Sequence, residues 1–205
     1  MTRHVVPPGG VTTMTPARRL KNILGGSAGN FVEWFDWFAY SAFAIYFSRA
    51  FFPAGDQTAQ LLGAAAIFAV GFIARPLGAL LFGGYADRAG RRTALTLSVA
   101  MMCGGSLMIA LIPTGLGVLS PALLLVARLL QGLSVGGEYG ASATYISEMA
   151  ERTQRGFWSG FLYVTLTGGQ LAALLLLVLL QRVLTEQQLY EWGWRIPFAV
   201  GAALA

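Results

Sequence analysis

Residues 59–82 read AQLLGAAAIFAVGFIARPLGALLF, an apolar run whose only charged side chain is Arg75. A helix needs about 20 apolar residues to cross the hydrocarbon core of a bilayer. This run is long enough, and the polar stretch GGYADRAGRR at 83–92 follows it. The segment therefore predicts a transmembrane helix that ends in a short polar connection.

Similar runs lie on both sides of this one. They cover about residues 22–52, 93–112, 121–146, 156–181 and 194–205. The last run is too short to cross a bilayer and the chain stops within it, so we expect an incomplete sixth helix. The sequence predicts an all-α membrane protein with a helical bundle over residues 22–205. Residues 1–21 begin with a Pro- and Gly-rich stretch and are expected to form a flexible cytoplasmic tail.

The composition excludes an ordinary soluble domain. Of the 205 residues, 56% are hydrophobic and 11% are charged, whereas soluble domains carry about 25% charged residues. The net charge is +5, but the basic residues cluster at the ends of apolar runs, which favours a membrane topology over nucleic-acid binding. We therefore expect a lipid bilayer, and no nucleic acid, as a partner.

Most basic residues outside the apolar runs gather on one side of the predicted bundle, and the opposite side has only Arg49, Arg182 and Arg195. The larger group precedes the first long run, follows the second and follows the fourth: Arg3, Arg18, Arg19, Lys21, Arg88, Arg91, Arg92, Arg152 and Arg155. Cytoplasmic loops of membrane proteins carry an excess of Lys and Arg. The pattern predicts a multi-pass protein whose N-terminus is cytoplasmic.

Polar side chains recur inside the apolar runs, mostly at spacings of three and four residues, which place them on one helix face. They are Asn30, Glu33, Asp36, Tyr40, Arg75, Arg128, Gln131, Glu138, Tyr163, Thr167 and Gln170. A charge at membrane depth is costly and usually faces a cavity or a partner. At a rise of about 1.5 Å per residue, Asp36 and Arg128 reach comparable depths, which predicts an ion pair between them.

A structural interpretation competes with a functional one at these positions. The charges could form ion pairs that only join helices, the amides could be interhelical hydrogen-bonding groups, and the tyrosines could only pack. Catalytic interpretations have less support, because HExxH, CxxC and Walker-type GKS or GKT motifs are absent and no nucleophile–base pair stands out. Cys103 is the single cysteine, so no intrachain disulfide is expected. We expect neither an enzyme nor a cofactor.

Two segments resemble signatures of the major facilitator superfamily. GGYADRAGRR resembles the signature between the second and third helices, and RLLQGLSVGGEYG at 128–140 resembles the fourth-helix motif. The resemblance implies twelve helices in two six-helix halves, with the substrate between them. This chain would supply the N-terminal half with a truncated sixth helix, and a missing C-terminal half would complete a monomer. It also implies a conformational latch at Gly83, Asp87, Arg88, Gly90, Arg91, Arg92, Glu148 and Arg155.

Longer stretches are similar to the metabolite:proton symporter family within this superfamily. They are GNFVEWFDWFAY at 29–40, QGLSVGGEYGASATYISEMA at 131–150 and WGWRIPF at 192–198. That family includes carriers of α-ketoglutarate, citrate, shikimate, and proline or betaine, and the stretch EWGWRIPFAVGAALA at 191–205 resembles its bacterial α-ketoglutarate carriers. Ala89 stands where those carriers have a histidine, so no role of that histidine is transferred. The resemblance implies a place in the bacterial cytoplasmic membrane.

The resemblance further implies proton-coupled symport of a dicarboxylate, with α-ketoglutarate as the expected substrate, by alternating access. The expected substrate-binding residues are Arg75, Arg128, Asn30, Tyr40, Tyr163 and Gln170. The expected proton-coupling residues are Glu33, Asp36 and Glu138. A substrate carboxylate that competes for an arginine would release its acidic partner and favour protonation of that partner. Two alternatives stay open: a carrier of another solute of the same family, and a non-transporting fragment such as a sensor.

Overall fold

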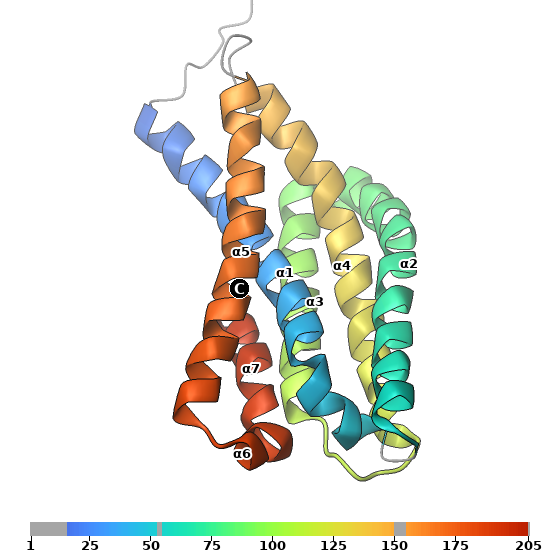
Figure 1. Ribbon diagram of the computed structural model, residues 1–205. Coiled ribbons are helices and arrows are strands. Elements are labelled where there is room, and N and C mark those ends of the chain that lie inside the picture. The colour runs from blue at the N-terminus through green and yellow to red at the C-terminus, as the bar shows by residue number, and fades with distance from the viewer. Residues whose placement is uncertain (1–15, 53–54, 150–154, 205) are drawn as a thin grey trace, which may run out of the picture.

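The computed structural model describes the backbone of residues 16–52, 55–149 and 155–204, and the side chains of 29–52, 55–90, 93–137, 160 and 163–204. The described residues form helices and connections, and no strand occurs among them. The helices are α1 (Pro16–Phe51), α2 (Gln57–Ala89), α3 (Arg91–Leu111), α4 (Leu119–Met149), α5 (Arg155–Val183), α6 (Glu186–Glu191), η1 (Gly193–Arg195) and α7 (Ile196–Leu204). Figure 1 shows a bundle of long helices.

The helices run back and forth between the two ends of the bundle. The N-terminal end of α1, the junction of α2 with α3, and the facing ends of α4 and α5 lie at one end (Figure 1). The α1–α2 and α3–α4 connections and α6 lie at the other end (Figure 1). Within the described part of the chain, four segments are long and apolar enough to cross a membrane: Gln57–Ala89, Thr93–Leu111, Leu119–Gly137 and Tyr163–Val183. α1 has 36 residues and carries the two buried carboxylates of Glu33 and Asp36.

The ends of the first two helices differ from the sequence prediction. α1 begins at Pro16, inside the expected tail, while residues 1–15 lie outside the described part of the chain. Proline suits the first helical turn because no N–H is needed there. α2 continues to Ala89, so most of the predicted polar connection is helical. Only Gly90 separates α2 from α3, and its φ of 90° lies in the region that favours glycine.

A short helix, α6, lies where the prediction placed a connection. The Thr185 side chain accepts a hydrogen bond from the Gln188 N–H at 3.3 Å, and the Gln188 side chain accepts one from the Thr185 N–H at 2.9 Å. This reciprocal pair is a capping box, which satisfies two backbone donors at the start of a helix. The final helix, α7, then begins at Ile196, two residues later than predicted.

Glycines bring the backbones of α2 and α4 into direct contact. A Cβ atom built on Gly132 would lie 2.2 Å from the carbonyl oxygen of Gly71, and one built on Gly136 would lie 1.9 Å from that of Arg75. Such distances leave no room for a side chain. Small residues at helix interfaces allow close packing where lipid provides no hydrophobic drive between helices. These two contacts fix α4 against the helix that carries Arg75.

Aromatic side chains fill the end of the bundle that holds α6. Phe47 and Phe51 of α1 lie against Trp194 of η1, with ring centroids 6.0 and 5.4 Å apart. The Arg195 guanidinium donates a hydrogen bond of 2.8 Å to the carbonyl of Ala110, in the last turn of α3. These contacts join α1 and α3 to η1 at this end of the bundle.

Candidate functional site

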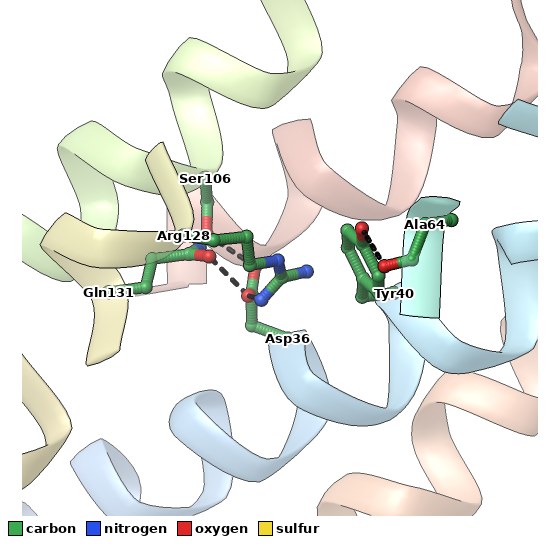
Figure 2. A network of polar contacts seen from close by, with 6 residues as sticks. All are labelled: Asp36, Tyr40, Ala64, Ser106, Arg128 and Gln131. Atoms are coloured by element: carbon green, nitrogen blue, oxygen red, sulfur yellow. Dashed lines mark hydrogen bonds and ion pairs between the residues drawn. The ribbon is translucent and has the colours of Figure 1, made fainter. Parts of the chain in front are cut away.

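A buried ion pair joins α1 to α4 in the middle of the bundle. The Arg128 Nη1 atom lies 3.2 Å from Asp36 Oδ2, and the two side chains are 0% and 2% exposed. Figure 2 shows the guanidinium directed at the carboxylate. The ion pair predicted from helix depth is therefore confirmed. A buried pair of opposite charges offsets part of the large cost of removing each charge from water.

Two neutral side chains complete the contacts of the Asp36 carboxylate. Gln131 of α4 donates from Nε2 to Asp36 Oδ2 at 2.8 Å and to Ser106 Oγ at 2.8 Å. Ser106 of α3 donates a short hydrogen bond to Asp36 Oδ1 (Figure 2). Gly105 makes room for this arrangement, because a Cβ atom there would lie 2.6 Å from Gln131 Cγ. The carboxylate is thus held by donors from two helices that face α1.

Aromatic rings surround the Arg128 guanidinium. Its Cζ atom lies 3.8 Å from the centroid of the Tyr40 ring and 5.4 Å from that of Trp37. The Tyr40 hydroxyl donates a 2.8 Å hydrogen bond to the carbonyl of Ala64 on α2, which fixes the ring (Figure 2). Cation–π attraction of this kind is stronger away from water. Tyr40, predicted as a substrate-binding residue, therefore supports the arginine of the ion pair.

Arg75 of α2 also lies close to Trp37 and is partly buried. Its Cζ atom lies 4.2 Å from the Trp37 centroid and 4.0 Å from that of Phe72. Trp37 therefore contacts both intramembrane arginines, since Arg128 lies 5.4 Å from the same ring. Both guanidinium groups therefore lie near one aromatic side chain of α1, and this residue directly follows Asp36 in the chain.

A polar bridge connects α1 with α5. The Asn30 amide donates a 2.6 Å hydrogen bond to Thr165 Oγ1, and Trp34 Nε1 donates one of 3.2 Å to Asn30 Oδ1. Asn30 is thus interhelical in this conformation, as the structural alternative proposed. Tyr163 of α5 is 73% exposed. Gln170 is half-buried on the same helix.

The structure describes only part of the predicted latch. Asp87 and Arg88 are exposed in the last turn of α2, and Gly90 forms the junction with α3. The side chains of Arg91, Arg92, Glu138, Glu148 and Arg155 lie outside the described residues, so their predicted roles stay predictions.

Residues 132–136, GLSVG, fit the GxSxG pattern of some serine hydrolases. In those enzymes the serine lies at a sharp turn between a strand and a helix. Ser134 instead lies within α4, is fully buried, and exchanges hydrogen bonds with Ser98 of α3. This serine therefore joins two helices and has no accessible nucleophilic oxygen.

Residues 23–205 match the family described as sugar (and other) transporter. The chain belongs to this family. It is thus a multi-pass membrane protein of the major facilitator superfamily, and the fold agrees. Against the xylose transporter XylE from Escherichia coli, the TM-score is 0.78 at 20% identity, over 91% of this chain and 45% of that one.

Curated relatives in this transporter family are also similar. The α-ketoglutarate permease of Escherichia coli is 55% identical over 95% of this chain and 46% of its own length. The citrate-proton symporter of Salmonella typhi is 41% identical, with 89% and 42% covered. The proline/betaine transporter of Escherichia coli is 35% identical, with 95% and 39% covered. The chain therefore spans less than half the length of these relatives.

Proposed function

We propose that the complete protein is a proton-coupled symporter of a small organic anion, with α-ketoglutarate as the first candidate substrate. The Asp36–Arg128 ion pair carries this proposal. A fully buried carboxylate beside an arginine, in the middle of a transporter-family bundle, can take up a proton and change the charge balance of the membrane interior. The 55% identity to an α-ketoglutarate permease supports the substrate.

Arg75 is the better candidate for the first contact with substrate. Arg128 is fully buried and engaged with Asp36, whereas Arg75 is only partly buried. A guanidinium group forms paired, charge-assisted hydrogen bonds with a carboxylate, which a dicarboxylate substrate supplies. The rings of Phe72 and Trp37, 4.0 and 4.2 Å from Arg75 Cζ, limit water and so strengthen that attraction.

Asp36 is the candidate proton carrier. When it takes up a proton, Arg128 loses its counter-charge, and the pair no longer joins α1 to α4 as strongly. An anionic substrate would then restore the charge balance around the two arginines near Trp37. Proton and substrate would therefore favour each other's binding, as symport requires.

The bundle end with Arg88 is proposed to face the cytoplasm, because an excess of Lys and Arg marks cytoplasmic loops. The same end would hold the latch around Asp87 and Gly90. This orientation places the N-terminus in the cytoplasm.

Uptake by the complete protein encoded by the gene, reconstituted in proteoliposomes, tests the proposal. Labelled α-ketoglutarate, citrate, shikimate and proline are supplied with and without an inward proton gradient. We expect the gradient to drive accumulation of α-ketoglutarate. Accumulation of proline without uptake of any anion would contradict the proposed organic-anion substrate. Uptake that is equal with and without the proton gradient would contradict the proposed coupling to protons.

Arg75→Lys is expected to raise the KM for α-ketoglutarate about tenfold, because lysine cannot form the paired hydrogen bonds of a guanidinium. Initial rates of uptake over a range of substrate concentrations measure the change. Arg49→Lys is the matched control, since Arg49 also lies over a ring, 4.6 Å from Tyr190, but is exposed near the end of α1. An unchanged KM in Arg75→Lys would remove Arg75 from the substrate site.

A further inference from the structure

We infer that Ser106 and Gln131 are positioning residues that set the proton affinity of Asp36, and that the coupling proton binds at Oδ1. This inference rests on the proposed function, because it concerns the carboxylate assigned there to proton transport. It adds two uncharged residues, one of them on α3, to a site otherwise made by α1 and α4.

The two oxygens of Asp36 have different partners. Oδ2 accepts from Arg128 Nη1 at 3.2 Å and from Gln131 Nε2 at 2.8 Å. The Arg128 Nη1 and Gln131 Nε2 atoms can only donate, so a proton on Oδ2 would oppose them. Oδ1 accepts from the Ser106 hydroxyl, which can equally accept. Oδ1 is therefore the oxygen that can be protonated without leaving two donors facing each other.

The hydrogen bonds can rearrange when the proton binds. The proton forms a bond to Oδ1, the carboxylate loses its negative charge, and Oδ1–H then donates to Ser106 Oγ. The Ser106 hydrogen needs a new acceptor. A serine hydroxyl within a helix can donate to the carbonyl one turn earlier, which for Ser106 is that of Met102. Gln131 can then keep its hydrogen bonds to Asp36 Oδ2 and to Ser106 Oγ.

The described charged and titratable groups near Asp36 come from α1, α2, α3 and α4, and Arg128 bonds to Oδ2 and not to Oδ1. Arg128 faces Asp36 from α4, and Glu33 and Tyr40 precede and follow it by about one turn on α1. Cys103 is one turn from Ser106 on α3, and Arg75 of α2 lies over Trp37. Gly201 of α7 lies near the same carboxylate, since a Cβ atom built on Gly201 would be 3.4 Å from Asp36 Oδ1. From α5, the described residues that contact α1 here, Thr165, Gly169 and Ala173, do not titrate.

Ser106→Ala tests the inference without changing any charge. Removing a donor to the ionised carboxylate favours the protonated form. We therefore expect the midpoint of the pH profile of α-ketoglutarate exchange to move to higher pH by about one pH unit. Exchange by the complete protein in proteoliposomes, at equal pH on both sides, measures this midpoint. Gln131→Leu is expected to shift it in the same direction, which gives a second test if one variant folds poorly.

Ser98→Ala is the matched control. Ser98 lies on the same helix, is as buried as Ser106, and bonds to Ser134 instead of a carboxylate. An unshifted midpoint in Ser106→Ala and Gln131→Leu would overturn the inference, and so would an equal shift in Ser98→Ala. A wild-type protein whose exchange does not depend on pH would instead overturn the proposed function itself. A shift confined to the Ser106 and Gln131 variants supports the inference.

Discussion

Asp36→Asn is expected to abolish accumulation of substrate against its gradient while exchange of substrate across the membrane continues. Asparagine keeps the shape of the side chain but cannot take up a proton. The neutral asparagine side chain resembles protonated Asp36, a state that the proposed cycle includes. In both cases Arg128 lacks a counter-charge, so the fold must already tolerate this arrangement. The accumulation ratio should fall to about one, because no coupling free energy remains.

Gradient-driven uptake and counterflow in proteoliposomes separate these two activities. Asp56→Asn provides the control, since Asp56 is an exposed carboxylate whose Oδ1 accepts from the Ala59 N–H at 2.8 Å, at the start of α2. Asparagine caps helices about as well as aspartate. Continued accumulation by Asp36→Asn would move the proton site elsewhere, with Glu33 the next buried carboxylate on α1.

Gly136→Ala is expected to prevent stable folding. The added Cβ would lie 1.9 Å from the carbonyl oxygen of Arg75 and 2.9 Å from the Ala79 nitrogen. Both atoms belong to the α2 backbone, so no side-chain rotation relieves the clash and the two helices must separate. We expect a loss of more than about 3 kcal/mol, above the usual cost of one extra methyl group in a core.

The yield of monodisperse protein in detergent and its thermal unfolding midpoint measure this effect. Gly104→Ala is the matched control, because a Cβ atom at Gly104 on α3 meets nothing within 4 Å. Wild-type yield and midpoint in Gly136→Ala would show that the contact between α2 and α4 is looser than the structure has it.

The ion pair could be predicted from the sequence because charges inside apolar runs are rare and helix rise fixes their depth. Asp36 and Arg128 are two such charges, and Arg128 Nη1 lies 3.2 Å from Asp36 Oδ2. Ser106 could not be found in this way. Serine is common in transmembrane helices, and α3 carries no charge in the run around it. Only the packing of α3 against α4 shows that this hydroxyl reaches Asp36.

The helix ends show a similar limit. The polarity of the stretch GGYADRAGRR predicts a connection between two transmembrane helices. A helix can nevertheless continue beyond the hydrocarbon core, and α2 continues to Ala89. Gly90 is the single residue whose φ, 90°, breaks it. The start of α6 did have a signal, since Thr185 and Gln188 have the spacing of a capping box. A polar segment between two apolar runs is equally typical of a loop, so the spacing alone does not decide between the two.

The direct backbone contacts at Gly132 and Gly136 have a consequence for how the carrier moves. Main-chain contact leaves little room for one helix to shift against the other, so α2 and α4 would move together in the proposed cycle. Arg75 lies on α2 and Arg128 on α4, so the spacing between these two cations would change little. Glu33, Asp36 and the Trp37 ring belong to α1. A change in the distance between cation and carboxylate would then require a displacement of α1.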